Sequence, residues 1–177
     1  DQGFDTKLKA DCARDWVVIP RRKRLLPDSW TLEEDGRPPI DYEYILFEQL
    51  ITNKFIWGTT WEERTLARMH IPIDDTMHIQ GSCYFMAKDW FKECGFMDQR
   101  YGGFAQESEE IVFETIKRGG EVKVNKNTWY AHLHKTQEER AWFHLPPESL
   151  RQGFEYSYKR WVIEHQPLFD EFMDRFA

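Results

Sequence analysis

Hydrophobic and polar positions along the chain switch between the period of a strand and the period of a helix. Short apolar or alternating runs predict strands at residues 16–19, 41–47, 81–86, 121–124 and 128–134. The first of these is expected to stop at Pro20. Helical spacing predicts helices at residues 60–69 and 88–94, and from Ser108 to the glycine pair at 119–120. Strands that alternate with helices indicate an α/β chain with a mixed sheet and flanking helices.

Two further amphipathic helices are expected near the end of the chain. Phe154, Tyr158 and Trp161 mark the first, and Phe169 and Phe172 mark the second. Their apolar faces could pack on the domain, form a dimer or touch a membrane, and packing is favoured because the amphipathicity is ordinary. We therefore expect a main part at residues 1–145 and a C-terminal helical extension at residues 146–177.

Composition narrows the classes of function. Hydrophobic residues make up 41% of the 177 residues and aromatic residues 16%, enough for a substantial core. The net charge of −7 argues against nucleic acid as a partner. No apolar run approaches the length of a membrane span, so we expect no transmembrane segment. The three cysteines lack disulfide or metal spacing, which favours a reducing, cytoplasmic location.

One basic run, at residues 21–24, is out of keeping with this acidic background. By itself it fits a targeting tag, an anion-binding loop or a solvated loop after a strand. We favour the solvated loop.

Three patches carry candidate chemistry. Gly81 and Ser82 come at the start of a predicted strand, where a small residue lets a ligand approach the backbone. Glu107 and Glu110 fall near one face at the start of a helix, where they can cap it or act as a general base. His132 shares a strand face with His134, a geometry that can hold a metal, although H-x-H alone is weak evidence.

The order and spacing of these patches resemble the acceptor-side, C-terminal half of GT-A glycosyltransferases. The relevant features are the Gly-Ser pair, F-K-E-C-G-F-M-D at residues 91–98, G-F-A-Q-E-S-E-E from Gly103, a glycine pair, and Y-A-H-L-H-K at residues 130–135. They are similar to inverting family 2 enzymes and to polypeptide N-acetylgalactosaminyltransferases. The resemblance spans about residues 17–135 and implies a partial GT-A fold.

The resemblance also implies roles for individual residues. Gly81, Ser82 and Gly103 would line the sugar site, and Lys135 would lie near the donor diphosphate. Glu107 would bind or deprotonate the acceptor, with Glu110 in reserve. His132 would be a ligand of Mn²⁺ or Mg²⁺.

The implied activity is transfer of a sugar from a nucleotide-diphosphate donor to a hydroxyl of a glycan, lipid or protein. Two departures from the family pattern matter. Phe104, Ala105 and Gln106 replace its W-G-G, and Ser108 stands where inverting members place an Asp base. The D-x-D or D-x-H motif is also missing, so we expect a donor-binding half upstream in the same protein. The alternatives are a non-catalytic sugar-binding or assembly module and, last, a small zinc protein that uses His132 and His134.

Overall fold

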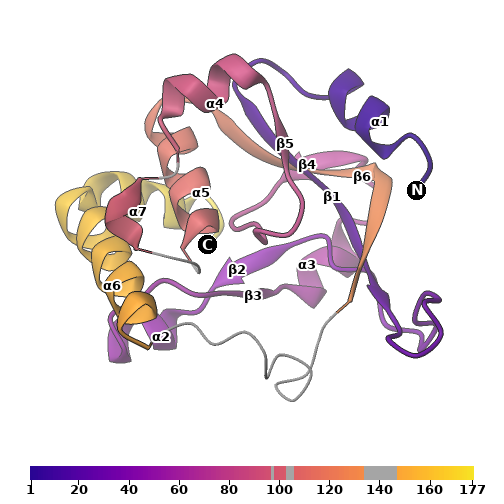
Figure 1. The fold of residues 1–177 in the computed structure, drawn as a ribbon, viewed down its shortest axis with the longest axis horizontal. Coiled ribbons are helices and arrows are strands. Elements are labelled where there is room, and N and C mark those ends of the chain that lie inside the picture. Colours follow the sequence, from indigo (N-terminus) through magenta and orange to yellow (C-terminus); the bar gives the residue numbers. More distant parts are fainter. Residues whose placement is uncertain (97, 103–105, 134–146) are drawn as a thin grey trace.

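The computed structural model describes residues 1–96, 98–102, 106–133 and 147–177. Its centre is a four-stranded mixed sheet with the strand order β4-β6-β1-β5 (Figure 1). The strands are β1 (Trp16–Leu25), β4 (Ile73–Asp75), β5 (Phe85–Met86) and β6 (Glu121–Leu133). β1 runs parallel to β6, whereas β4 and β5 are antiparallel to their neighbours. Parallel pairing joins distant parts of the chain, which is typical of an α/β architecture.

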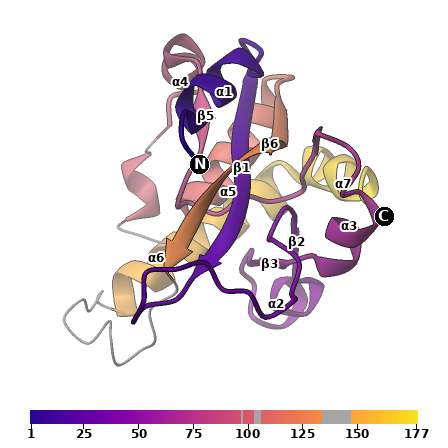
Figure 2. The ribbon, with the colours of Figure 1, turned by 90° about the vertical axis from the view of Figure 1, so that its right-hand side faces the viewer.

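β1 continues well beyond the point at which we expected it to stop. The strand passes through Pro20 and ends at Leu25, with a register shift against β6 between Pro20 and Arg21. A proline is tolerated there because a bulge removes the need for its missing N–H in the ladder. The basic run at residues 21–24 is therefore strand, and its interpretation as a solvated loop is wrong. Figure 2 shows β1 and β6 side by side along most of their length.

A small second sheet lies next to the central one. It pairs β2 (Glu43–Ile45) with β3 (Gly58–Thr60), and α2 (Phe47–Thr52) lies between them in the chain. The strand predicted at 41–47 is thus shorter, because its last residue begins a helix. α3 (Glu62–Ala67) is shorter than the predicted helix at 60–69. Trp61 is its N-cap, without a side-chain hydrogen bond.

The remaining helices surround the central sheet. They are α1 (Phe4–Ala10), α4 (Lys88–Cys94), a 3₁₀ turn (Gln99–Tyr101), α5 (Glu107–Lys117), α6 (Pro147–Tyr158), a π-helical turn (Lys159–Glu164) and α7 (Gln166–Asp174). The helix predicted at 88–94 is confirmed, and Gly95 ends it with a left-handed φ of 67°. The strands predicted at 121–124 and 128–134 form the single long β6.

The core joins the C-terminal helices to the sheet and to α5. The ring of Phe113 in α5 stacks on Trp161 at a centroid distance of 5.3 Å and contacts Phe169 and Phe172. Val17 of β1 belongs to the same buried cluster. The helical extension therefore packs on the rest of the chain through shared core residues.

These features define a mixed α/β fold in which helices flank the sheet. Two of the helices lie at the C-terminal end of the chain. Within the described residues, no helix combines the length and the apolar character that crossing a membrane requires.

A candidate active-site groove

The end of the long β1–β6 pair presents polar side chains on one face of the sheet. Arg22 is paired with Tyr130, and Arg24 is paired with His132. Partners in adjacent strands point to the same side, as do residues two apart in one strand. Tyr130 and His132 therefore share a face with the two arginines, and their ring centroids are 6.4 Å apart.

The segment around Gly81 connects this face to the start of α5. The hydroxyls of Ser82 and Tyr130 share a hydrogen bond at 2.5 Å. Gly81 lies against Glu107, since a Cβ built at Gly81 would be 2.7 Å from Glu107 Oε1. Gly81, Ser82, Glu107 and the Tyr130–His132 pair are thereby brought into one neighbourhood, although residues 81–84 are not strand as predicted.

A groove with two unlike ends runs through this neighbourhood. One cavity of about 270 Å³ is lined by Trp57, His78, Ile79, Gly81, Glu107, Ser108 and Glu109, and we call it the acidic end. A second cavity of about 470 Å³ includes Arg22, Arg24 and Arg37 in its wall, and we call it the basic end. Glu43, Gly58 and Gln80 line both cavities. The two ends are therefore parts of one groove.

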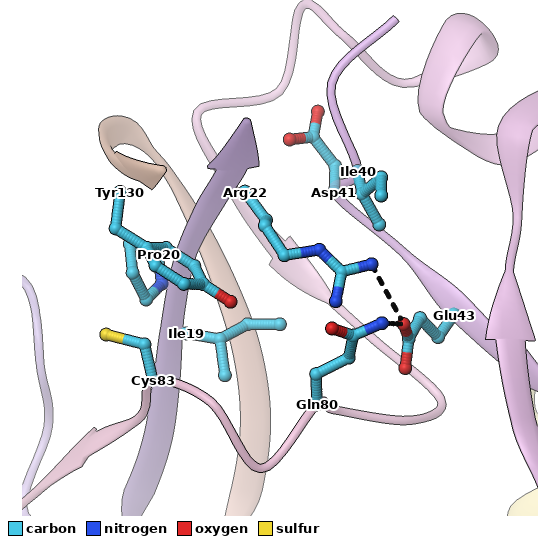
Figure 3. A pocket seen from close by; sticks show the side chains of 9 residues that line it. All are labelled: Ile19, Pro20, Arg22, Ile40, Asp41, Glu43, Gln80, Cys83 and Tyr130. Atoms are coloured by element: carbon cyan, nitrogen blue, oxygen red, sulfur yellow. Dashed lines mark hydrogen bonds and ion pairs between the residues drawn. The ribbon is translucent and has the colours of Figure 1, made fainter. Parts of the chain in front are cut away.

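Beneath the groove, Arg22 and Gln80 converge on one carboxylate. Figure 3 shows both side chains directed at Glu43. Arg22 Nη2 is 3.4 Å from Glu43 Oε1, and Gln80 Nε2 donates to the same oxygen. The space beside them is only about 10 Å³, near the lower limit for a single water. This part of the site is packed.

A buried histidine extends this ionic chain to helix α5. His78 Nδ1 is 3.1 Å from Glu43 Oε2, and its Nε2 is 3.0 Å from Glu109 Oε1. Burial by itself lowers the pKa of His78, but the two carboxylates, Glu109 first, outweigh it and raise the pKa to about 10. The imidazole is therefore a cation between two anions at neutral pH. Charges alternate along the chain Arg22–Glu43–His78–Glu109, which we call the buried ionic chain.

The two candidate carboxylates on α5 have different surroundings. Glu107 is the first residue of the helix and lines the acidic end of the groove. Glu110 is buried and accepts a hydrogen bond at 2.8 Å from the backbone N–H of Asp98. Glu110 is not among the residues that line the acidic end. This placement favours a structural role for Glu110 and leaves Glu107 as the carboxylate that a ligand can reach.

A complete metal site is not found in the part of the chain that the structure describes. No three or more His, Cys, Asp and Glu side chains there are grouped so that they could hold a metal ion. His132 is paired with Arg24 of the basic end but is not among the residues that line either cavity. Gly103, His134 and Lys135, which we also considered, lie outside the described residues.

Several residues of the groove were not predicted from the sequence. Arg22, Glu43, His78 and Glu109 form the buried ionic chain. Arg22 belongs to the basic run and Glu109 to the motif at residues 103–110, but the sequence assigned neither of them a role in a site. One available signal was His78 between Met77 and Ile79, a polar residue inside an apolar run. Another was the basic run itself, because a strand with alternating sides would bury every second member.

No family model matches the chain, and no curated protein matches it. Solved structures do match. One is the crystal structure of GalNAc-T7 with UDP, GalNAc and Mn²⁺, with a TM-score of 0.59 and 16% sequence identity. The match covers 95% of this chain and 30% of the GalNAc-T7 chain, so the present chain spans less than a third of that protein. The likeness shows a fold similar to part of a glycosyltransferase of the GT-A type.

Proposed function

We propose that the chain is the acceptor-side part of a glycosyltransferase that moves a sugar from a nucleotide-diphosphate donor to a hydroxyl group. The observation that carries the proposal is the groove. Its acidic end holds the carboxylate of Glu107. Its basic end holds the guanidinium groups of Arg24 and of Arg37, the latter paired with Glu33 and Asp35. Sugar transfer needs an acceptor of protons at one end and stabilisation of a leaving diphosphate at the other.

The basic end is the proposed place for the donor's diphosphate. Arg24 has a backbone carbonyl, Pro38 O at 2.9 Å, as its hydrogen-bond partner. This partner carries no charge, so the hydrogen bond does not neutralise the guanidinium of Arg24. The guanidinium can therefore still attract an anion in the adjoining cavity. As the bond from the anomeric carbon to the diphosphate breaks, the departing oxygens gain negative charge that the guanidinium groups stabilise.

The acidic end is the proposed place for the acceptor hydroxyl. Glu107 would take the proton from that hydroxyl while the hydroxyl oxygen attacks the anomeric carbon of the donor sugar. The absence of a side chain at Gly81 leaves room for this carboxylate, since a Cβ there would lie 2.7 Å from Glu107 Oε1. Ser108 cannot serve as a base near neutral pH, so its hydroxyl would bind the substrate or orient Glu109, to which it donates at 3.2 Å.

The resemblance implies Mn²⁺ or Mg²⁺, for which this chain offers His132 as one candidate ligand. The described residues contain no complete set of ligands. A bound ion would supply positive charge to stabilise the leaving diphosphate. The remaining ligands, like the nucleotide-binding surface, would belong to an upstream donor-binding half. The three free cysteines fit a reducing, cytoplasmic setting for the reaction.

The second candidate function is a non-catalytic sugar-binding or assembly module. Ser108 at the position of the expected base favours it, as does the incomplete set of metal ligands among the described residues. Such a module would keep the acidic end of the groove and would not need a donor.

Calorimetry with UDP, in the presence and absence of Mn²⁺, separates the two functions. It should be run on this chain and on a version extended at its N-terminus by the native sequence. A transferase binds UDP in the extended version, and Arg24→Ala weakens that binding about tenfold, as expected for a lost charged contact of about 1.4 kcal/mol. Arg14→Ala, which removes an exposed arginine paired with Glu93, is the matched control. Absence of UDP binding in both versions contradicts the transferase and leaves the module.

A further inference from the structure

Trp57 presents an exposed indole on a fixed piece of main chain. Its side chain is 46% exposed, although the preceding Ile56 is fully buried. The carbonyl of Trp57 accepts a hydrogen bond from the N–H of Leu46 at 2.9 Å. The carbonyl of Ile56 accepts one from Gln106 Nε2 at 3.4 Å. The backbone on both sides of the indole is therefore held in place by hydrogen bonds.

Two phenylalanines support the indole from one side. The Phe154 ring of α6 is 6.0 Å from Trp57 and 4.8 Å from Phe55, and the centroids of Phe55 and Trp57 are 6.4 Å apart. Aromatic contacts at these distances restrict how the rings turn. These contacts therefore restrict the orientation of the indole of Trp57.

The same indole is a wall of the groove's acidic end. The other walls include the apolar Ile79, the carboxylate of Glu107, the hydroxyl of Ser108 and the bare backbone of Gly81. One side of a ligand in this cavity thus contacts the flat apolar indole, and another side contacts hydrogen-bond acceptors. At about 270 Å³ the cavity is just below the range of about 300–1,000 Å³ typical of small-molecule sites, which suits a single ring.

The chemistry of these walls discriminates between classes of ligand. A pyranose has faces of C–H groups and a rim of hydroxyl donors, so it matches both kinds of wall at once. A lipid chain would place apolar groups against the carboxylate of Glu107 and offer it no hydrogen-bond donor. A phosphate or carboxylate would meet Glu107 and Glu109, whose negative charges disfavour an anion.

We infer that Trp57 is the stacking platform of an acceptor subsite for an uncharged pyranose ring. That the bound ring is an acceptor rests on the proposed function. Among the three acceptor classes named above, glycan, lipid and protein, the inference selects a glycan. Stacking on the indole holds the ring against the acidic end, and Glu107 accepts a hydrogen bond from one of its hydroxyls. Trp57 is in this scheme a residue that binds and orients substrate.

The test is titration of the 177-residue chain with simple glycosides, followed through its indole N–H signals by NMR. The probes are the methyl glycosides of glucose, galactose, N-acetylglucosamine and N-acetylgalactosamine, with methyl glucuronide as the charged comparison. The Trp57 signal is assigned by its loss in Trp57→Phe. At least one neutral glycoside should shift that signal, and methyl glucuronide should bind at least about tenfold more weakly.

Variants decide whether the indole carries the binding. Trp57→Ala should weaken the neutral glycoside by about tenfold or more, and Trp57→Phe by less, since a smaller ring keeps part of the stacking. Trp30→Ala, which removes an indole that is 71% exposed and not part of the groove, should leave the affinity unchanged. Circular dichroism establishes that each variant is folded.

Each pattern of results separates this inference from the proposed function. Glycoside binding that depends on Trp57, without any binding of UDP, supports the subsite and contradicts the transferase. UDP binding without a shift of the Trp57 signal by any neutral glycoside overturns the subsite and keeps the transferase. Unchanged glycoside affinity in Trp57→Ala also overturns the subsite.

Discussion

At Gly81 the main chain passes so close to Glu107 that the two residues act as one feature of the groove. A side chain at position 81 would occupy the space of the Glu107 carboxylate, whose Oε1 would be 2.7 Å from the new Cβ. The obstacle is the end of a flexible side chain and not backbone. The carboxylate can turn away, which changes where it points more than it changes the stability of the fold.

Gly81→Ala is therefore expected to separate activity from stability. Sugar transfer should fall by about tenfold or more because Glu107 is misdirected, while the free energy of unfolding should change by less than about 1 kcal/mol. Urea denaturation and transfer assays on the same preparation measure the two effects. A large loss of stability would show that the carboxylate cannot move and that our description of this contact is wrong.

The two carboxylates of α5 should respond in opposite ways. Glu107→Gln removes the proposed base and should lower the rate of transfer by about 10²–10⁴-fold with little effect on folding. Glu110→Ala leaves the partly buried N–H of Asp98 without this acceptor and should destabilise the fold by about 1–3 kcal/mol. Kinetics and chemical denaturation test the pair. Equal loss of activity in a folded Glu110→Ala protein would assign Glu110 a catalytic role.

The sequence predicted the neighbourhood of the site better than its interior. Gly81, Ser82, Glu107 and His132 were selected from the order of weak motifs. The described structure places Gly81 against Glu107, and Ser82 and His132 each against Tyr130. The buried ionic chain could not be predicted in this way. His78 reaches carboxylates that are 35 and 31 positions away, and ion pairs over such separations have no local pattern.

At the scale of elements, the buried ionic chain links β1, β2 and α5 through four charged side chains. His78 has the central position, between Glu43 of β2 and Glu109 of α5. A Cβ at Gly58 of β3 would come within 2.2 Å of the imidazole, so that strand also fixes the ring. Removal of one member of a buried ion pair leaves the other without compensation, which is more costly than the pair itself is stabilising.

His78→Gln should destabilise the fold by about 3–5 kcal/mol. It should also change the dependence of stability on pH. Because the pKa of His78 is raised from 6.5 to about 10, its protonated form stabilises the folded state fully below pH 6.5. That contribution is lost as the pH rises toward and through 10.

Urea titrations at several pH values provide the measurement. The wild-type chain should lose stability between about pH 6.5 and 10, and the loss should be smaller in His78→Gln, in which lysines, tyrosines and cysteines still titrate. The difference between the two curves isolates the histidine. Parallel curves for the two proteins would mean that His78 is neutral in the folded state.

The ends of helices and strands were predicted correctly where a local residue determines them and incorrectly where distant pairing does. α4 was predicted correctly because Gly95 supplies a local stop with φ at 67°. β1 was predicted too short because Pro20 is a local stop as well, yet pairing with distant β6 resumes after a bulge. Long-range pairing overrides a local breaker, and a single sequence does not display it.

At the scale of the whole molecule, the C-terminal helices and the sheet depend on one core. Trp161 in the π-helical turn is fully buried and donates a hydrogen bond to the hydroxyl of Tyr101 at 2.8 Å. It also stacks on Phe113 of α5. A defect at Trp161 is therefore transmitted to the part of the chain that carries Glu107.

Trp161→Ala should destabilise the entire chain by about 3–5 kcal/mol in one cooperative transition. Ile163→Ala, in the same π-helical turn but at a side chain that is 61% exposed, should change stability by no more than about 0.5 kcal/mol. Far-ultraviolet dichroism and tryptophan fluorescence should give coincident curves. If Trp161→Ala instead produces two separate transitions, the helical extension from residue 146 folds as a unit of its own.

The parallel pairing of β1 with β6 also affects how the chain folds during its synthesis. Trp16 cannot meet its partner Glu121 until most of the chain has left the ribosome. Before that, the intervening segment can pair with β1 through β5 and through isolated bridges at Ile40 and Leu32. Such non-local pairing slows folding and raises the relative contact order. During synthesis the apolar start of β1 remains an unpaired edge, open to association with other nascent chains. We therefore expect this topology to make aggregation during expression more frequent than it is for a fold with mainly local pairing.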